Sequence, residues 1–201
     1  GQTEDLDTCV DVVSPEQTAL TATAVSEIGP PADGALAVDV VACSKLISAD
    51  ANGKSDPFVE LQLGTAAHRT KVKKKTLDPQ FGEKFEFPVV LADAEATDGW
   101  TLRVTVWDKD KGAKNNDFLG SLDVSLTDVF AENWSTFQVH TWALSDNDGV
   151  MRGQKELEQV ERRKQNGSSQ PYGAVTLGLR YLEGATASPN LGGSEPEPAA
   201  Y

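Results

Sequence analysis

Apolar and polar residues alternate along most of this chain with a period of two residues. In a β-strand successive side chains point to opposite faces, so this period predicts strands that have one buried face. Clusters of Gly, Pro, Asn and Asp separate the alternating segments, as is typical of an antiparallel sandwich of two sheets. The expected strands cover 36–42, 58–63, 67–75, 85–87, 101–107, 121–126, 136–143 and 175–181. We therefore expect an all-β fold, an eight-stranded antiparallel β-sandwich.

One segment before the last expected strand departs from this pattern. Residues 153–165 read GQKELEQVERRKQ, which is composed mostly of good helix formers. Leu157 and Val160 supply a narrow apolar stripe. We expect a short surface helix within an insertion at about 146–171; a charged loop without helical structure is the alternative.

The net charge of −13 is distributed unevenly along the chain. Residues 1–34 carry seven acids and no base, and residues 183–201 carry three acids and no base. Both ends are rich in small and polar residues, which bury too little apolar surface to offset the entropy of ordering a backbone. We expect an acidic N-terminal linker at 1–34, a folded domain at 35–183 and a flexible C-terminal tail at 184–201.

Composition and charge argue against several functions. The acidic balance disfavours a general nucleic-acid binder, which needs surplus cations to displace counterions. The chain contains no run of 18 apolar residues, so we expect no membrane-spanning helix. Cys9 and Cys43 do not suggest a disulfide framework, so a reducing, cytoplasmic location is expected. His68 and His140 have no Ser or Cys constellation near them in the sequence, and we expect no enzymatic activity.

Two acidic loops carry the strongest chemical signal. The first runs over 48–58 and the second over 107–120, and each lies directly beside expected strands. Pro57 favours an extended conformation for the residue before it, at the entrance to a strand. The five loop carboxylates belong to Asp50, Asp56, Asp108, Asp110 and Asp117.

Five converging carboxylates repel one another, and a divalent cation relieves that repulsion. Calcium accepts six to eight oxygen ligands in flexible geometry, which two loops can provide. Magnesium requires stricter octahedral geometry, and zinc prefers His or Cys ligands, which are absent from both loops. The loops therefore predict a Ca²⁺ site, although any one of these Asp residues alone would be ordinary turn chemistry.

Several motifs in order resemble the C2 domain, a calcium- and lipid-binding β-sandwich. They are SDPFVELQLG, KTLDPQFGEKFEF, LRVTVWDKD and NDFLGSLDV. The final GAVTLGLRYL is similar to the closing strand of the circularly permuted, type II form of the fold. NDFLG and this ending are also similar to C2 modules of extended synaptotagmins and other multi-C2 membrane tethers.

The resemblance implies which residues bind calcium. It assigns the carboxylate ligands to the five loop Asp residues, in a site shared between the two loops. Backbone carbonyls add two more ligands, at Ala49 and Lys109.

The loops also suggest how calcium would recruit a membrane. Five Asp and four Lys, among them Lys54, Lys111 and Lys114, give a net charge of −1. Two calcium ions would change this to about +3, which favours anionic phospholipid. The loop tips carry no large apolar side chain, so we expect salt-sensitive surface binding rather than insertion.

A second group of bases follows the first loop at Arg69, Lys71 and Lys73. On a strand these residues would share one face. Two interpretations remain open: a solvated strand face, or a patch for phosphoinositides of the kind that family members carry.

The sequence as a whole predicts a monomeric, calcium-dependent module that binds anionic phospholipid and is peripheral at membranes when calcium is bound. Two alternatives remain. The domain could bind a protein, with calcium only stabilising the loops, or it could regulate a lipid-modifying enzyme whose catalytic part lies elsewhere.

Overall fold

The computed structural model describes residues 30, 32–50, 53–91, 100–110, 116–146 and 154–187. Cys9, Lys111 and Lys114 lie outside these residues, as do most of the expected N-terminal linker and C-terminal tail. None of the described helices is long and apolar enough to cross a membrane.

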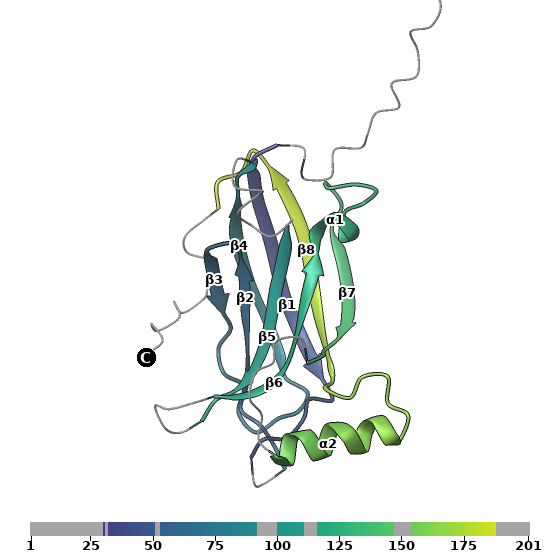
Figure 1. The fold of residues 1–201 in the computed structure, drawn as a ribbon. Coiled ribbons are helices and arrows are strands. Elements are labelled where there is room, and N and C mark those ends of the chain that lie inside the picture. Colours follow the sequence, from purple (N-terminus) through teal and green to yellow (C-terminus); the bar gives the residue numbers. More distant parts are fainter. Residues whose placement is uncertain are drawn as a thin grey trace, which may run out of the picture.

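The predicted β-sandwich is confirmed. Two four-stranded antiparallel sheets face each other, one in the order β4-β1-β8-β7 and the other in the order β3-β2-β5-β6 (Figure 1). The strands are β1 Gly34–Ser44, β2 Pro57–Leu63, β3 Ala66–Arg69, β4 Gln80–Val89, β5 Thr101–Asp108, β6 Asp117–Ser125, β7 Gln138–Ala143 and β8 Ala174–Glu183.

The order of the strands confirms the type II topology. The last strand, β8, pairs with β1 along its whole length, from Gly34 opposite Glu183 to Ser44 opposite Ala174. On its other side β1 pairs with β4. The first strand of the domain is therefore central in its sheet, and it ends just before the first acidic loop.

The core lies between the two sheets and is formed by the alternating apolar residues. Its members include Leu36, Val38 and Val40 of β1 and Leu102, Val104 and Val106 of β5, all at most 1% exposed. Burying each such side chain contributes roughly 1.5–3 kcal/mol to folding. The aromatic rings of Phe85 and Phe87 on β4 are fully buried in the same core.

A β-bulge changes the pattern near the end of β1. The register with both neighbouring strands shifts between Val40 and Ala42: the extra residue is on β1 opposite β8, and on β4 opposite β1. As a result Cys43 is buried, whereas Ala42 is only half-buried. The buried positions of β1 therefore change from the even-numbered residues between Leu36 and Val40 to the odd-numbered Cys43.

The segment expected to form one strand at 67–75 is strand only in part. Strand β3 ends at Arg69, and Lys75 has a positive φ of 55°, which lies outside the strand region. The chain after β3 continues beside β2 without regular strand pairing: the Thr70 N–H donates to the Val59 carbonyl, and the Lys73 N–H donates to the Pro57 carbonyl. The interpretation that Arg69, Lys71 and Lys73 share one strand face was therefore wrong.

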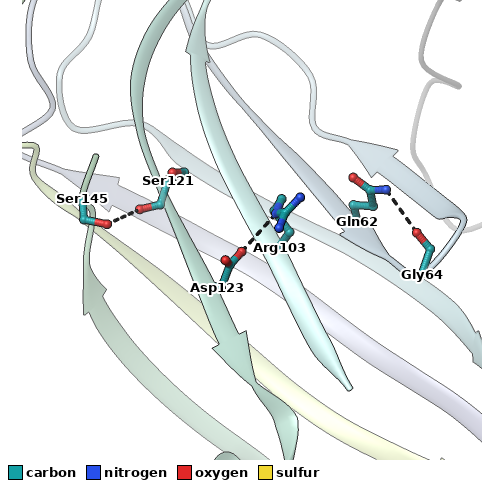
Figure 2. A network of polar contacts seen from close by, with 6 residues as sticks. All are labelled: Gln62, Gly64, Arg103, Ser121, Asp123 and Ser145. Carbon is teal, nitrogen blue, oxygen red and sulfur yellow. Dashed lines mark hydrogen bonds and ion pairs between the residues drawn. The ribbon is translucent and has the colours of Figure 1, made fainter. Parts of the chain in front are cut away.

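Polar contacts occur between strands, at a turn and at one edge of the β3-β2-β5-β6 sheet (Figure 2). Arg103 of β5 pairs with Asp123 of β6 at 3.1 Å, and Gln62 of β2 donates to the carbonyl of Gly64 at 3.1 Å. Ser145, just after β7, donates to the carbonyl of Ser121 on β6 at 3.2 Å. This last contact joins the edges of the two sheets.

The predicted helix in the insertion is also confirmed. Helix α2 covers Gln154–Gln165 and lies across the end of the sandwich at which β1 ends (Figure 1). Gly167 follows it with a φ of 78°, which suits a helix C-terminus, and its N–H donates to the carbonyl of Lys164. Val160 is buried and Leu157 is 43% exposed, so only one of the two apolar residues faces the domain.

A one-turn helix, α1 (Leu126–Val129), follows β6 directly. The Ser125 side chain caps it by accepting from the Asp128 N–H. Leu126 is buried in the core, so this turn closes the sandwich beside the end of β6.

Position 173, just before β8, requires glycine because other backbone atoms approach it closely. Its φ is +96°, and an added Cβ would come within 2.5 Å of the Ser44 carbonyl and 2.8 Å of the Lys45 carbonyl. Gly82 of β4 has a similar φ of +63° but open space around the position of a Cβ.

We predict that Gly173→Ala destabilises the domain by clearly more than Gly82→Ala. Both substitutions incur the left-handed backbone cost of roughly 1–2 kcal/mol, and only the first adds a clash with backbone atoms. Chemical denaturation of the two variants checks this. Equal losses of unfolding free energy would show that the contact at Gly173 relaxes without cost.

Candidate functional site

The two acidic loops meet at one end of the sandwich because the strands that carry them are neighbours. Strand β2 begins at Pro57, which is opposite Asp108 at the end of β5. Asp108 is in turn opposite Asp117 at the start of β6. Three of the predicted ligands, Asp56, Asp108 and Asp117, therefore lie at adjacent strand ends.

A bulge in β6 sets this alignment. The register of β5 and β6 shifts after Val106, which pairs with Gly120, so that Trp107 pairs with Phe118 and Leu119 is the extra residue. Without this shift, Phe118 rather than Asp117 would stand opposite Asp108. The bulge thus brings a carboxylate to the strand end that faces the acidic loops.

Asp108 occupies a buried position for a simple reason. It continues the inward phase of β5 set by Val104 and Val106, and it is only 2% exposed. Burial raises the pKa of its carboxyl from the ordinary value of 3.8 to about 6, and the nearby charges of Asp50 and Asp56 act in the same direction. The Asp56 N–H, which donates to this carboxylate, and the Ser55 hydroxyl oppose the shift in pKa.

Asp56 connects the first loop to its surroundings. Its carboxylate Oδ1 accepts from the backbone N–H of Lys75 at 2.7 Å, and its carbonyl accepts from the N–H of Lys109 at 3.0 Å. The half-buried Asp56 is thereby fixed beside Asp108. The same contact to Lys109 holds the start of the second loop against the first.

The base of the first loop is closed around Ser55. This fully buried hydroxyl accepts from the Ala49 N–H and donates to the Ile47 carbonyl, both at 3.1 Å. In the same loop the Asp50 N–H donates to the Lys54 carbonyl at 3.1 Å. Sequence reasoning missed Ser55; its place directly before Asp56 in the first acidic loop was the only signal.

The donor set suits a hard cation. All five predicted carboxylates are described, and Asp50, Asp56, Asp110 and Asp117 are half-buried. Asp50, Asp56 and Asp108 interact electrostatically. Oxygen donors at the ends of neighbouring strands match calcium chemistry.

The carboxylates are not gathered as closely as a bound ion would hold them. Within the described part of the chain, no three acidic, His or Cys side chains form a ready metal-holding group. The mutual repulsion of the acids opposes closer approach without a cation.

The basic residues lie along the edge between β3 and β4. Lys71 is exposed, and its N–H donates to the carboxylate of Glu83 at 3.0 Å. Lys73 is half-buried, with Nζ 6.0 Å from the centre of the Phe81 ring. Arg69 is half-buried at the end of β3.

The other predicted lipid contacts belong to the loops themselves. Lys54 is exposed in the first acidic loop, whereas Lys111 and Lys114 lie outside the described residues. Glu60, which pairs in register with Arg69, accepts from the Trp107 indole at 2.8 Å. An acid therefore stands within the sheet next to the basic edge.

The side chains of His68 and Cys43 pack within the domain, and their contacts within the described part of the chain include no reactive partner. The His68 ring packs on Phe85 and Phe87, with its Nε2 at 3.1 Å from the Glu86 carbonyl oxygen. Burial raises the pKa of the Cys43 thiol to about 12, which suppresses the reactive thiolate.

The raised pKa of Asp108 gives a prediction about pH. The folded protein holds a proton on Asp108 up to about pH 6, whereas the unfolded chain releases it near pH 3.8. Folding stability in calcium-free buffer should therefore fall as the pH rises from about 4 to about 6, by on the order of 2–3 kcal/mol. Above that range this contribution stays constant.

Asp108→Asn should remove this loss and raise the unfolding free energy at pH 7, because the amide carries no charge. Denaturant titrations of wild type and variant between pH 4 and 7 measure the difference. Asp123→Asn, at an exposed ion pair with Arg103, serves as the control and should keep the wild-type slope. A wild-type curve parallel to that of Asp108→Asn would contradict the prediction.

Comparison with known proteins agrees with this architecture. The sequence model of the C2 domain matches residues 34–141. Multiple C2 and transmembrane domain-containing protein 1 of Mus musculus is 33% identical over 107 residues, which are 53% of this chain and 11% of that protein. The Rattus norvegicus protein of the same name is 33% identical over 116 residues, 58% of this chain and 11% of its length. The chain thus spans about a tenth of these relatives.

Solved structures share the fold. A C2 domain of plant Extended Synaptotagmin 1 has a TM-score of 0.54 at 22% identity, over 76% of this chain and 97% of that one. A calcium-bound structure of two C2 domains of Extended-Synaptotagmin 2 has a TM-score of 0.53 at 24% identity, over 77% and 48%. With the sandwich, its strand order and the match over more than half of its length, this chain belongs to the C2 domain family.

Proposed function

We propose that this domain binds anionic phospholipid membranes in a calcium-dependent manner and acts as a membrane-targeting module. The observation that carries the proposal is the buried carboxylate of Asp108 beside Asp50 and Asp56, where two acidic loops meet. A buried carboxylate with acidic neighbours is costly unless a cation compensates it.

We assign the ligands as the sequence predicts: the carboxylates of Asp50, Asp56, Asp108, Asp110 and Asp117, with the backbone carbonyls of Ala49 and Lys109. Calcium, when bound, neutralises these acids and can contact lipid phosphate. The chain supplies a rigid inner side, because Asp56 and Asp108 are held by backbone N–H groups. The repulsion between the carboxylates opposes their closer approach, and a bound cation would relieve it.

Bases beside the loops determine what the calcium-loaded end attracts. Lys54 is exposed and Lys109 follows Asp108 directly, and Lys111 and Lys114 belong to the same loop. Each base near an anionic surface contributes about 1 kcal/mol, within a Debye length of about 10 Å. We therefore assign lipid binding to Lys54, Lys111 and Lys114, with calcium changing the sign of the local charge.

The basic edge at Arg69, Lys71 and Lys73 is proposed as a second contact for anionic headgroups, including phosphoinositides. Lys71 is its most exposed member, while Lys73 rests on Phe81. This contact would be made through a strand end and the turn after it, since β3 stops at Arg69.

The names of the relatives support a role at a membrane. Their names combine several C2 domains with a transmembrane domain, so C2 modules belong to a larger membrane protein there. We place this domain on the cytoplasmic side, as a monomer that is peripheral at the membrane.

Two alternatives make different predictions. A protein-binding module would show no calcium-dependent lipid binding by the isolated domain. A regulator of a lipid-modifying enzyme would bind lipid in the same way, with catalysis supplied by another part of a longer chain.

Liposome sedimentation tests the main proposal. We expect the protein to sediment with phosphatidylserine vesicles in calcium and to stay in the supernatant with chelator, and binding should weaken strongly between about 0.1 M and 0.5 M salt. Asp108→Asn should lose the calcium response, whereas Asp123→Asn should retain it. Equal sedimentation of wild type in calcium and in chelator would refute the proposal.

The second contact has its own test. Lys71→Ala should weaken binding to vesicles containing phosphoinositide about fivefold, since it removes one cation that contributes about 1 kcal/mol. Lys84→Ala, on the other sheet and 72% exposed at its side chain, is the matched control and should bind like wild type. Equal binding of Lys71→Ala and Lys84→Ala to these vesicles would show that the patch does not exist. The double variant Lys71→Ala/Lys73→Ala removes a second base of the patch and extends the comparison.

A further inference from the structure

Helix α2 is attached to the backbone that enters the first acidic loop. The side-chain amide of Gln159 accepts from the Ser48 N–H at 3.1 Å and donates to the Ser48 carbonyl at 2.7 Å. A single side chain thus pairs with both backbone groups of one residue, as a neighbouring strand would. The partners are 111 residues apart in sequence.

Arg163, one turn further along α2, holds the residues before Ser48. Its Nη2 donates to the Leu46 carbonyl at 2.9 Å, and its Nη1 donates to the carbonyls of Lys45 and Pro171. The guanidinium therefore ties the start of the loop to the chain that follows the helix. Burial lowers its pKa, which is the expected cost of placing a cation against the domain.

These contacts belong to one face of the helix. Gln159 and Arg163 are four residues apart and so lie above one another, with Val160 buried next to them. Leu157 and Arg162 are exposed. The polar contacts of this face converge on the backbone that leads into the first acidic loop, whereas the opposite face is open to solvent.

The loop entrance is then held from two sides. The Ser55 hydroxyl fixes Ile47 and Ala49 from the interior, and Gln159 fixes Ser48, between them, from the outside. Ser48 comes directly before Ala49 and Asp50, a carbonyl and a carboxylate assigned to calcium. Their position depends on the backbone that the helix holds.

We propose that Gln159 and Arg163 are positioning residues of the calcium site, and that α2 sets its affinity by pre-ordering the first loop. This inference rests on the proposed function. Without the amide pair, Ser48 and the residues after it gain conformational freedom, and calcium binding has to remove that freedom at the expense of affinity. By reciprocity, bound calcium favours the docked helix by the same factor.

The experiment compares Gln159→Ala with Gln165→Ala, an exposed Gln on the last turn of the same helix. In calcium-free buffer, amide hydrogen exchange at Ser48, Ala49 and Asp50 should be faster in Gln159→Ala and unchanged in Gln165→Ala. Calorimetric titration with CaCl₂ should show an affinity about three- to tenfold lower for Gln159→Ala alone, the range for a lost hydrogen-bonding group.

A second pair of variants keeps charge constant. Arg163→Lys cannot reach three carbonyls at once and should also weaken calcium binding, whereas Arg162→Lys should not. Exchange and affinity equal to wild type in both Gln159→Ala and Arg163→Lys would overturn the inference. If wild type bound no calcium, the proposed function and the effect on affinity would both be wrong, and the exchange rates alone would decide the positioning role.

Discussion

The acidic end of this domain is organised around one buried carboxylate. Asp108 is placed inside by the same two-residue period that buries Val104 and Val106, so the strand that builds the core also desolvates an acid at its end. Desolvation raises its pKa to about 6 and destabilises the charged form at neutral pH. The fold therefore places a negative charge where the two acidic loops meet, and a cation would stabilise that charge.

The residues around Asp108 are held in place by neutral backbone N–H groups and a hydroxyl rather than by positively charged side chains. The Asp56 N–H donates to Asp108, the Lys75 N–H donates to Asp56, and the Ser55 hydroxyl closes the first loop. Such contacts orient the oxygens without neutralising them, which leaves their charge to attract a cation. Helix α2 extends the same principle outward, because Gln159 binds the backbone of Ser48 rather than a carboxylate.

Local pattern was sufficient for much of the fold. Strict alternation predicted the strands, and the run of helix formers at 153–165 predicted α2, since both signals depend on side chains within one element. The errors came where neighbouring strands intervene. The bulge after Val40 shifted the buried phase to Cys43, and β3 ended at Arg69 although the following chain stays beside β2. Neither the bulge nor the early end of β3 is visible in the alternation of apolar and polar residues along the sequence.

The sequence by itself determined the sandwich, the two acidic loops and the identity of their carboxylates, because residue type and spacing encode strand faces and loop chemistry. Only the tertiary structure decided how these parts meet. The bulge at Leu119 places Asp117 opposite Asp108, and the return of the chain through α2 brings Gln159 to Ser48. Contacts between residues 111 positions apart depend on how the sheets and the insertion pack, and spacing along the chain carries no record of that packing.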